Sequence, residues 1–388
     1  MKENKIIALV LVFLCIAAVS ACTRSDALTG SSSWAGMVNE DDIIYISNGS
    51  FVEAVQNGQK LWSYPESANN RLSFYAAPAV NESYVIVGTY ANQLHILNKS
   101  DGTLAASAEA GNNKHKIIAA PVIEDGKVYL TSNGGTVSSY TINVSGETMA
   151  PNWQTTLTSE IWVKPVSYDG TLYVITMDKK MNLLDAATGE LKQSIEIGAV
   201  MSDPVFADEK LYFTTLSKEV NEMDLSANTV RTVFSTDAEI WASPLLMGDK
   251  LIAADMNGVV YCADLASGAI QWKTDKLTAE KKGFVASPVA LDEETIVLVD
   301  ESGNIMTYDM AGKSISQRSL GENVTVCTTP VILSNGSFAV VPVSTDGQIK
   351  AFTADLKEDW IYTRGTGSTP TAEPTAEASA EPTAAEAK

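Results

Sequence analysis

The sequence predicts an all-β fold in which eight similar units each form one four-stranded antiparallel sheet. Three observations lead to this prediction. A motif of two small residues, a proline and an apolar residue recurs about every 42 residues. Most units contain a nearly continuous apolar run, which is typical of a strand buried on both faces. All seven tryptophans fall at two positions of the repeat. Sheets buried on both faces must stack on one another, and radial stacking gives an eight-bladed β-propeller of four-stranded antiparallel blades.

The proline position marks the start of each unit. It is occupied by Pro78, Pro121, Pro165, Pro204, Pro244, Pro288 and Pro330, and by Met37 in an upstream eighth unit. The first strand is expected to begin here, because proline cannot donate to a ladder and is tolerated at the start of an edge strand. A linear solenoid is the alternative arrangement, but it needs polar capping repeats and none is visible. The eight units account for residues 34–364.

The remaining strands follow in order within each unit. A turn such as Asp125-Gly126 leads into the apolar second strand, for example residues 172–175, and a second turn such as Asn257-Gly258 leads into the third. Third strands end in an aspartate at one repeat phase, namely at Asp185, Asp224, Asp264 and Asp309. Recurrence in several units favours hydrogen bonding within turns over catalysis.

The fourth strand carries a bulky residue four positions after a glycine. Trp62 and Trp272 lie four residues after Gly58 and Gly268, Trp360 holds the same position in the last unit, and Trp153 holds it after a short insertion. The other tryptophans, Trp34, Trp162 and Trp241, each lie three residues before the proline position. The first unit starts with its own first strand and the last ends with its own fourth strand. We therefore expect the ring to close without strand exchange.

The N-terminus is predicted to be a lipoprotein signal peptide over residues 1–21. Lys2 and Lys5 flank an apolar run over residues 6–19, which is too short to span a bilayer but suits a secretory signal. The run ends in Val-Ser-Ala followed by Cys22, which resembles the bacterial lipobox, so Cys22 is predicted to be lipidated and residues 22–33 to form a linker. Ordinary cleavage after Ala21 is the alternative. Lipidation would anchor the chain outside the cytoplasm, on the outer face of the cytoplasmic membrane or on the outer membrane.

Charge and composition narrow the function further. The chain has a net charge of −20, which disfavours binding to the phosphate backbone of nucleic acids. Residues 365–388 repeat Pro, Thr, Ala and Glu, and this apolar-poor acidic tail is predicted to be disordered.

Few residues are available for common catalytic chemistry. Two histidines and four cysteines leave little material for metal or Cys/His sites, so we expect no catalytic, cofactor or metal site. His95 is predicted to be a packing residue on a third strand. Cys262 and Cys327 are expected to be buried free thiols because they lie in non-adjacent units, although an oxidising compartment would permit a disulfide.

The repeat resembles the PQQ-type propeller repeat, with its best matches at residues 243–272 and 164–190. In that family the Asp/Gly turn and the tryptophan lock adjoining blades together. Together with the lipoprotein signal and eight units, the chain resembles the BamB-type lipoproteins, which help to assemble outer-membrane β-barrels. The quinoprotein enzymes of the superfamily carry a vicinal disulfide, whereas Cys262 and Cys327 are 65 positions apart, so a PQQ-dependent dehydrogenase is disfavoured.

The best candidate contact residues lie in connections between units. Fourth-to-first connections share one face of a propeller with second-to-third turns, and on this acidic chain several of them carry basic side chains. The candidates are Asn69, Asn70, Arg71, Lys114, His115, Lys116, Lys281 and Lys282. Solvated loops without a partner are the simpler interpretation.

The sequence therefore predicts a membrane-anchored, BamB-like, non-catalytic scaffold. Its expected partners are the membrane, through its lipid, and an envelope or surface protein, and the propeller itself is expected to be monomeric. A propeller that binds or senses a small ligand at the cell surface is the alternative.

Overall fold

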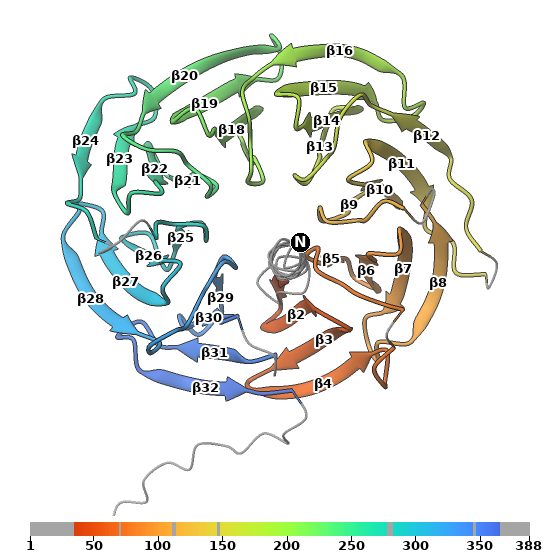
Figure 1. The fold of residues 1–388 in the computed structure, drawn as a ribbon, viewed down its shortest axis with the longest axis horizontal. Helices are drawn as coiled ribbons and strands as arrows, with labels where there is room; N and C mark the ends of the chain where they lie inside the picture. The colour runs from red at the N-terminus through yellow and green to blue at the C-terminus, as the bar shows by residue number, and fades with distance from the viewer. Residues whose placement is uncertain are drawn as a thin grey trace, which may run out of the picture.

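Eight four-stranded sheets are arranged around a central axis in the computed structural model (Figure 1). The structure describes residues 35–69, 71–110, 114–145, 148–277, 282–343 and 347–364. Among these residues, no helix is long and apolar enough to cross a membrane. The predicted signal peptide, linker and tail, with Cys22 and Trp34, lie outside the described residues.

Each blade is an antiparallel meander of four consecutive strands. Blades 1 to 4 are β1 (Gly36–Glu40), β2 (Ile43–Asn48), β3 (Phe51–Gln56), β4 (Gln59–Tyr64); β5 (Ala79–Val80), β6 (Tyr84–Gly88), β7 (Gln93–Asn98), β8 (Leu104–Glu109); β9 (Val122–Glu124), β10 (Lys127–Thr131), β11 (Thr136–Thr141), β12 (Trp153–Thr156); β13 (Val166–Tyr168), β14 (Thr171–Thr176), β15 (Lys180–Asp185), β16 (Leu191–Glu196). Blades 5 to 8 are β17 (Val205–Ala207), β18 (Lys210–Thr214), β19 (Glu219–Asp224), β20 (Thr229–Ser235); β21 (Leu245–Met247), β22 (Lys250–Ala254), β23 (Val260–Asp264), β24 (Ile270–Lys273); β25 (Val289–Ala290), β26 (Thr295–Val299), β27 (Asn304–Asp309), β28 (Ser314–Ser319); β29 (Val331–Ile332), β30 (Phe338–Val340), β31 (Ile349–Phe352), β32 (Glu358–Tyr362).

This architecture confirms the predicted eight-bladed propeller. The blade that contains β1 is completed by β4 and the blade that contains β29 by β32, so the ring closes without strand exchange, as expected. In seven blades the first strand begins one residue after the proline position, so the proline precedes the ladder instead of opening it.

The hydrophobic core lies between neighbouring blades. One cluster joins Ile86 and Ile96 of blade 2 to Val128 and Leu130 of blade 3, all essentially inaccessible to solvent. Second and third strands are buried almost throughout their length, because each is covered by a blade on both faces. This arrangement explains why the second strands are continuously apolar instead of alternating.

Tryptophans of the fourth strands connect one blade to the next. The Nε1 of Trp62 donates to the carbonyl of Lys99 at 2.9 Å, and that of Trp272 donates to Met310 at 3.0 Å. The Trp62 ring lies against Gly102, where a Cβ would come within 2.4 Å of it and where φ is +72°. Glycine is therefore required at this turn, both for the backbone conformation and for the ring.

Candidate interaction face

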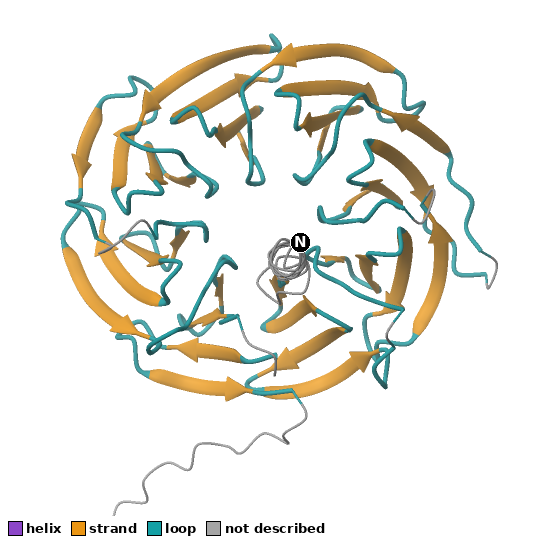
Figure 2. Ribbon diagram, in the orientation of Figure 1, coloured by secondary structure: helices purple, strands orange, loops and turns teal. Residues whose placement is uncertain are grey.

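The meander topology gives the disc two different faces. We call the face that carries the fourth-to-first connections and the second-to-third turns the loop face, and the opposite one the turn face. Figure 2 shows the connections crossing from an outer strand of one blade to the innermost strand of the next. All the predicted contact residues that the structure describes lie on the loop face.

The predicted contact residues fall into two separate groups. Arg71 is exposed in the connection from β4 to β5, where its backbone N–H donates to Asn69 Oδ1 at 3.0 Å. Lys114 is exposed and His115 and Lys116 are half-buried in the connection from β8 to β9. Exposed Lys282 lies in the connection from β24 to β25, between blades 6 and 7. Asn70 and Lys281 lie outside the described residues.

Blades 1 to 3 bring the first group together. The N–H of Tyr90, in the turn between β6 and β7, donates to the carbonyl of Ser73 at 2.9 Å. The Tyr75 and Tyr90 rings are 4.5 Å apart, and Lys116 Nζ lies 4.7 Å from the Tyr90 ring centroid. The connections that hold Arg71 and Lys116 therefore meet at this pair of tyrosines, which sequence reasoning did not single out.

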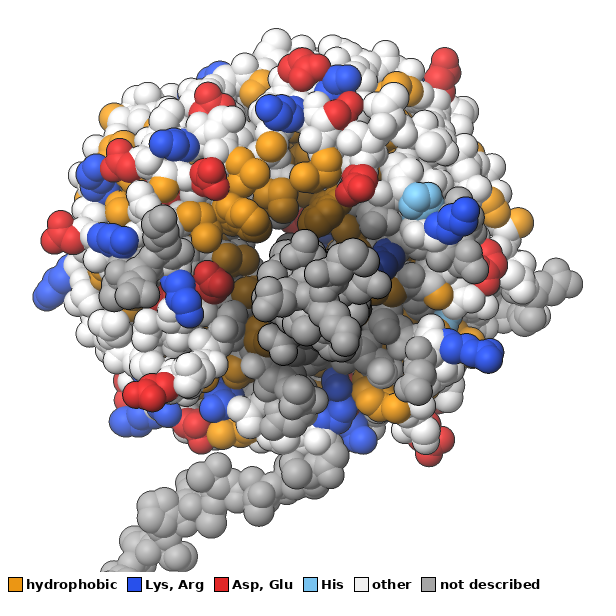
Figure 3. All heavy atoms as spheres, in the orientation of Figure 1, with side chains coloured by type: hydrophobic (Ala, Val, Ile, Leu, Met, Phe, Trp, Pro, Cys, Tyr) orange, Lys and Arg blue, Asp and Glu red, His pale blue; other side chains and the backbone are white. Residues whose placement is uncertain are grey.

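Seven described apolar side chains share one repeat position, just before the innermost strand of a blade, on the loop face. They all lie three residues before the proline position, and we call them the collar: Tyr75, Ile118, Trp162, Met201, Trp241, Val285 and Cys327. Trp162 is 37% exposed and the others are half-buried, whereas the residues one position earlier are completely buried. Figure 3 shows hydrophobic side chains gathered at the upper and left sides of the centre of the disc. Sequence reasoning used Trp162 and Trp241 only to establish the phase of the repeat. It did not recognise that this repeat position forms a partly exposed apolar surface.

The turn face is strongly acidic. Its described turns carry Asp41, Asp42, Glu82, Asp101, Asp125, Asp169, Glu190, Asp208, Glu209, Asp249, Asp292, Glu293, Glu294 and Asp355, against Lys99, Lys313 and Lys357. In contrast, the β4–β5 and β8–β9 connections carry Arg71, Lys114 and Lys116 against Glu66. Much of the negative charge of the protein therefore lies on the face opposite the candidate contacts.

Aspartates that end the third strands have the predicted role in turns. Asp185 Oδ1 accepts the N–H groups of Ala187 and Thr188, both at 2.9 Å. The Lys192 ammonium and then these donors hold the pKa of Asp185 below its ordinary value. The equivalent contacts are made by Asp224, Asp264 and Asp309. These carboxylates are engaged in closing the turns that connect third to fourth strands.

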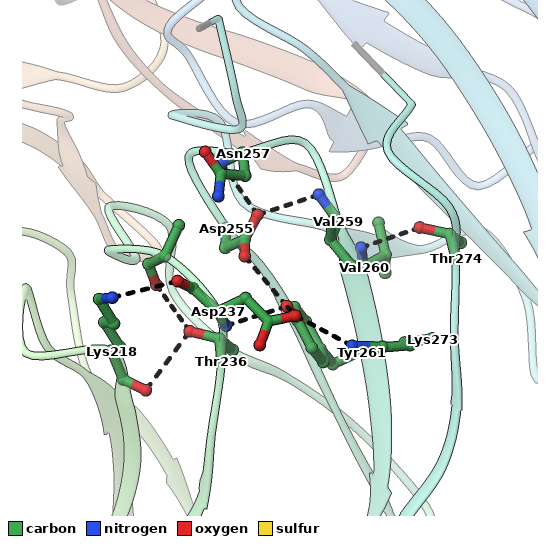
Figure 4. Close-up of polar contacts among 11 residues, drawn as sticks. Lys218, Thr236, Asp237, Asp255, Asn257, Val259, Val260, Tyr261, Lys273 and Thr274 are labelled. Atoms are coloured by element: carbon green, nitrogen blue, oxygen red, sulfur yellow. Dashed lines mark hydrogen bonds and ion pairs between the residues drawn. The ribbon is translucent and has the colours of Figure 1, made fainter.

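A polar network fixes the connection between blades 5 and 6 (Figure 4). Lys273 Nζ lies 2.9 Å from Asp237 Oδ2, and the Tyr261 hydroxyl lies 3.0 Å from the same oxygen and 3.2 Å from Asp255 Oδ2. The hydrogen bonds from Lys273 and Tyr261 lower the pKa of Asp237, and burial raises the pKa of Tyr261. Asp237 belongs to the β20–β21 connection and the other three to blade 6, so the network holds a loop to its blade.

The two described cysteines and His95 are packed within the propeller. Cys262 and Cys327 are free, as expected, although Cys327 is half-buried in the collar instead of fully buried. Burial raises the pKa of both thiols to about 11, so they are protonated at neutral pH. His95 is 6% exposed and packs between blades 1 and 2, which confirms its predicted role. The described residues contain no group of three His, Cys, Asp or Glu side chains suited to a metal ion.

Comparison with known proteins places the repeat in one family. The family described as outer membrane protein assembly factor BamB matches residues 48–274 and 257–385. A BamB from Yersinia pestis is 23% identical over 73% of this chain and 71% of its own length. The BamB proteins of Shewanella oneidensis and Xanthomonas campestris are 26% and 32% identical, but these alignments cover only 21% and 20% of their lengths.

Two solved structures show the same fold. The crystal structure of BamB from Moraxella catarrhalis superposes with a TM-score of 0.62 at 19% identity, covering 82% of this chain and 91% of that one. The computationally designed protein Ika8 gives a TM-score of 0.65 at 14% identity, over 83% and 96% of the two chains. Because a designed protein fits as well as a natural one, this similarity describes the architecture alone.

Proposed function

The chain belongs to the family of outer membrane protein assembly factor BamB, and from this premise we propose that it is a non-catalytic scaffold for protein assembly in the cell envelope. The observation that carries the proposal is the family match, which extends over nearly the whole propeller. The partner is a protein that docks on the loop face. Its contacts include Asn69, Asn70, Arg71, Lys114, His115, Lys116, Lys281 and Lys282.

Two features of the loop face support this assignment. The collar offers apolar area that is accessible to a partner, and apolar side chains rimmed by polar loops are typical of interaction surfaces. The turn face, in contrast, combines acidic turns with few basic residues. The non-catalytic part of the proposal is supported by three kinds of titratable group: the turn aspartates are hydrogen-bonded, the thiols are protonated and His95 is buried.

Membrane anchoring through lipidated Cys22 forms part of the same proposal. β1, the first described strand after the predicted linker, begins on the loop face, as the other first strands do. Twelve residues, 23–34, separate Cys22 from the first described residue and span at most about 40 Å when extended. Such a tether would hold the loop face within reach of partners at the membrane, and the propeller would act as a monomer.

Site-specific photo-crosslinking in the native cell tests the proposed contact face. A photoreactive residue at position 69, 71 or 114 should capture one envelope protein in common, whereas the same probe at the exposed turn-face residues Ala187 or Ala266 should not. Equal capture from both faces, or no adduct from the loop face, would contradict the proposal.

Cys22→Ala should release the protein from membranes while leaving its purified fold unchanged, and continued membrane association would exclude the lipid anchor.

A further inference from the structure

The last described residue holds the start of the C-terminal tail on the loop face of blade 1. Arg364 Nε lies 2.9 Å from Glu53 Oε2, and Arg364 Nη2 donates to the carbonyl of Asn48 at 3.1 Å. The guanidinium also lies 4.8 Å from the Phe51 ring centroid. Asn48 and Phe51 flank the β2–β3 turn, which belongs to the loop face. The described chain therefore ends at a fixed point on this face, immediately before residues 365–388.

A continuous surface leads from this point to the basic connections of blades 1 to 3. The carbonyl of Gly49, next to Asn48, accepts the N–H of Phe74 at 2.7 Å, in the connection that also carries Arg71. In the same connection, the carbonyl of Ser73 accepts the N–H of Tyr90 from blade 2. The Lys116 ammonium, in the β8–β9 connection, lies over the Tyr90 ring. The tail consequently starts beside the Arg71 connection and one blade away from Lys114 and Lys116.

The charges of the two parts are complementary. The tail contains the carboxylates of Glu373, Glu377, Glu381 and Glu386, with Lys388 as its only cation. The connections that carry Arg71, Lys114 and Lys116 contain one acidic residue, Glu66. Glu109, at the end of β8, accepts a hydrogen bond from Gln93. The acidic turn face repels the same carboxylates. Within a protein of net charge −20, the excess of basic over acidic side chains in these two connections favours contact with an acidic segment.

We propose that the acidic C-terminal tail binds back onto the loop face of blades 1 to 3, over Arg71, Lys114 and Lys116. Its 24 residues span at most about 80 Å, which exceeds the distance needed to cross two neighbouring blades. Covalent attachment gives the glutamates an effective concentration on the order of millimolar, so individually weak contacts suffice. The contacts are exposed ion pairs and are screened within about 8–10 Å at physiological salt. If the proposed function holds, the tail competes with the assembly partner for this surface.

Zero-length carbodiimide coupling of the purified full chain tests the contact directly. The reagent activates a carboxylate, and a lysine Nζ in contact with it displaces the leaving urea to form an amide. Trypsin cleaves after Arg364 and releases the tail as one peptide, which simplifies mass spectrometry. We expect the tail to be joined to Lys114 or Lys116 at low salt, with a yield at least threefold lower in 0.5 M NaCl. Mixing isotopically light and heavy protein should show that the product forms within one chain.

Charge variants provide the matched comparison. Arg71→Glu leaves both acceptor lysines in place but reverses a nearby charge, so it should lower the coupling yield at least threefold. Lys313→Glu on the turn face should not change it. Equal coupling of the tail to Lys313 or Lys357, no coupling to Lys114 or Lys116, or an unchanged yield in Arg71→Glu would each overturn the proposal. No partner takes part, so this experiment can fail while the scaffold function stands.

Discussion

His95 shows how burial determines the protonation state of one residue in the propeller. Its Nδ1 lies 2.9 Å from the Tyr64 hydroxyl, and its ring meets the edges of the Tyr64 and Phe74 rings at centroid distances of 5.7 and 6.1 Å. Burial between blades 1 and 2 disfavours the imidazolium and lowers the pKa of His95 to about 4, with Glu109 opposing the shift. The side chain is therefore neutral at physiological pH and acts as a packing residue with one polar contact.

This lowered pKa predicts a loss of stability in mild acid. The unfolded chain takes up a proton on His95 as the pH falls below about 6.5, whereas the folded chain does so only near pH 4. The contribution of His95 to the unfolding free energy should therefore fall by about 2 kcal/mol between pH 7.5 and pH 5. His95→Gln, which cannot titrate, should show a correspondingly smaller loss in urea unfolding at the two pH values. Parallel pH profiles for both proteins would contradict this prediction, because they would show that folding does not lower the pKa of His95.

At the scale of elements, a fourth strand stabilises the propeller through one side chain that reaches the next blade. Trp62 is 7% exposed, donates to Lys99 and fills the space above Gly102, whereas its neighbour Leu61 is 49% exposed on the outside of the disc. The two residues are consecutive and lie at a β-bulge in β4. They therefore share the same local backbone, but only the Trp62 side chain contacts the next blade.

Shortening these two side chains should have very different effects. Trp62→Ala removes a large buried ring and leaves a cavity between blades 1 and 2, which should lower the unfolding free energy by about 3–5 kcal/mol. Leu61→Ala removes an exposed side chain and should change it by less than about 0.5 kcal/mol. Chemical denaturation followed by circular dichroism measures both. A similar cost for the two substitutions would show that the indole does not stabilise the junction.

The repeat could be predicted from the sequence because its determinants are local. The apolar second strands, the Asp-Gly turns and the phase of the tryptophans each recur within a window of about 42 residues. The Tyr75–Tyr90 pair and the grouping of Arg71 with Lys116 depend on how blades 1 to 3 sit side by side, which no single repeat encodes. Only part of the collar could be recognised from the sequence. Tryptophans mark this repeat position, whereas the valine, methionine and cysteine that replace them in other units are too common in cores to be noticed.

At the scale of the whole molecule, one junction of the ring differs from the other seven. Every other pair of neighbouring blades is joined by a chain connection, whereas blades 8 and 1 meet only through non-covalent contacts. An apolar cluster that includes Ile44 and Ala339 packs across this junction. Glu53 of blade 1, 1% exposed, accepts the Tyr362 hydroxyl at 2.8 Å and binds Arg364 of the C-terminal end. Side-chain contacts at the ends of the propeller therefore close the ring without an exchanged strand.

Removing one partner of the buried Glu53–Arg364 pair should weaken ring closure. Arg364→Ala leaves the Glu53 carboxylate buried with only the Tyr362 hydroxyl bound to it, and should cost about 3–5 kcal/mol of unfolding free energy. The double variant Glu53→Gln/Arg364→Ala should cost less, because no uncompensated charge remains. Hydrogen exchange should show faster opening in blades 1 and 8 than in blades 4 and 5, since the ring opens first at the junction that no connection crosses. Uniform acceleration around the ring, or a double variant less stable than Arg364→Ala, would show that the apolar cluster alone closes the ring.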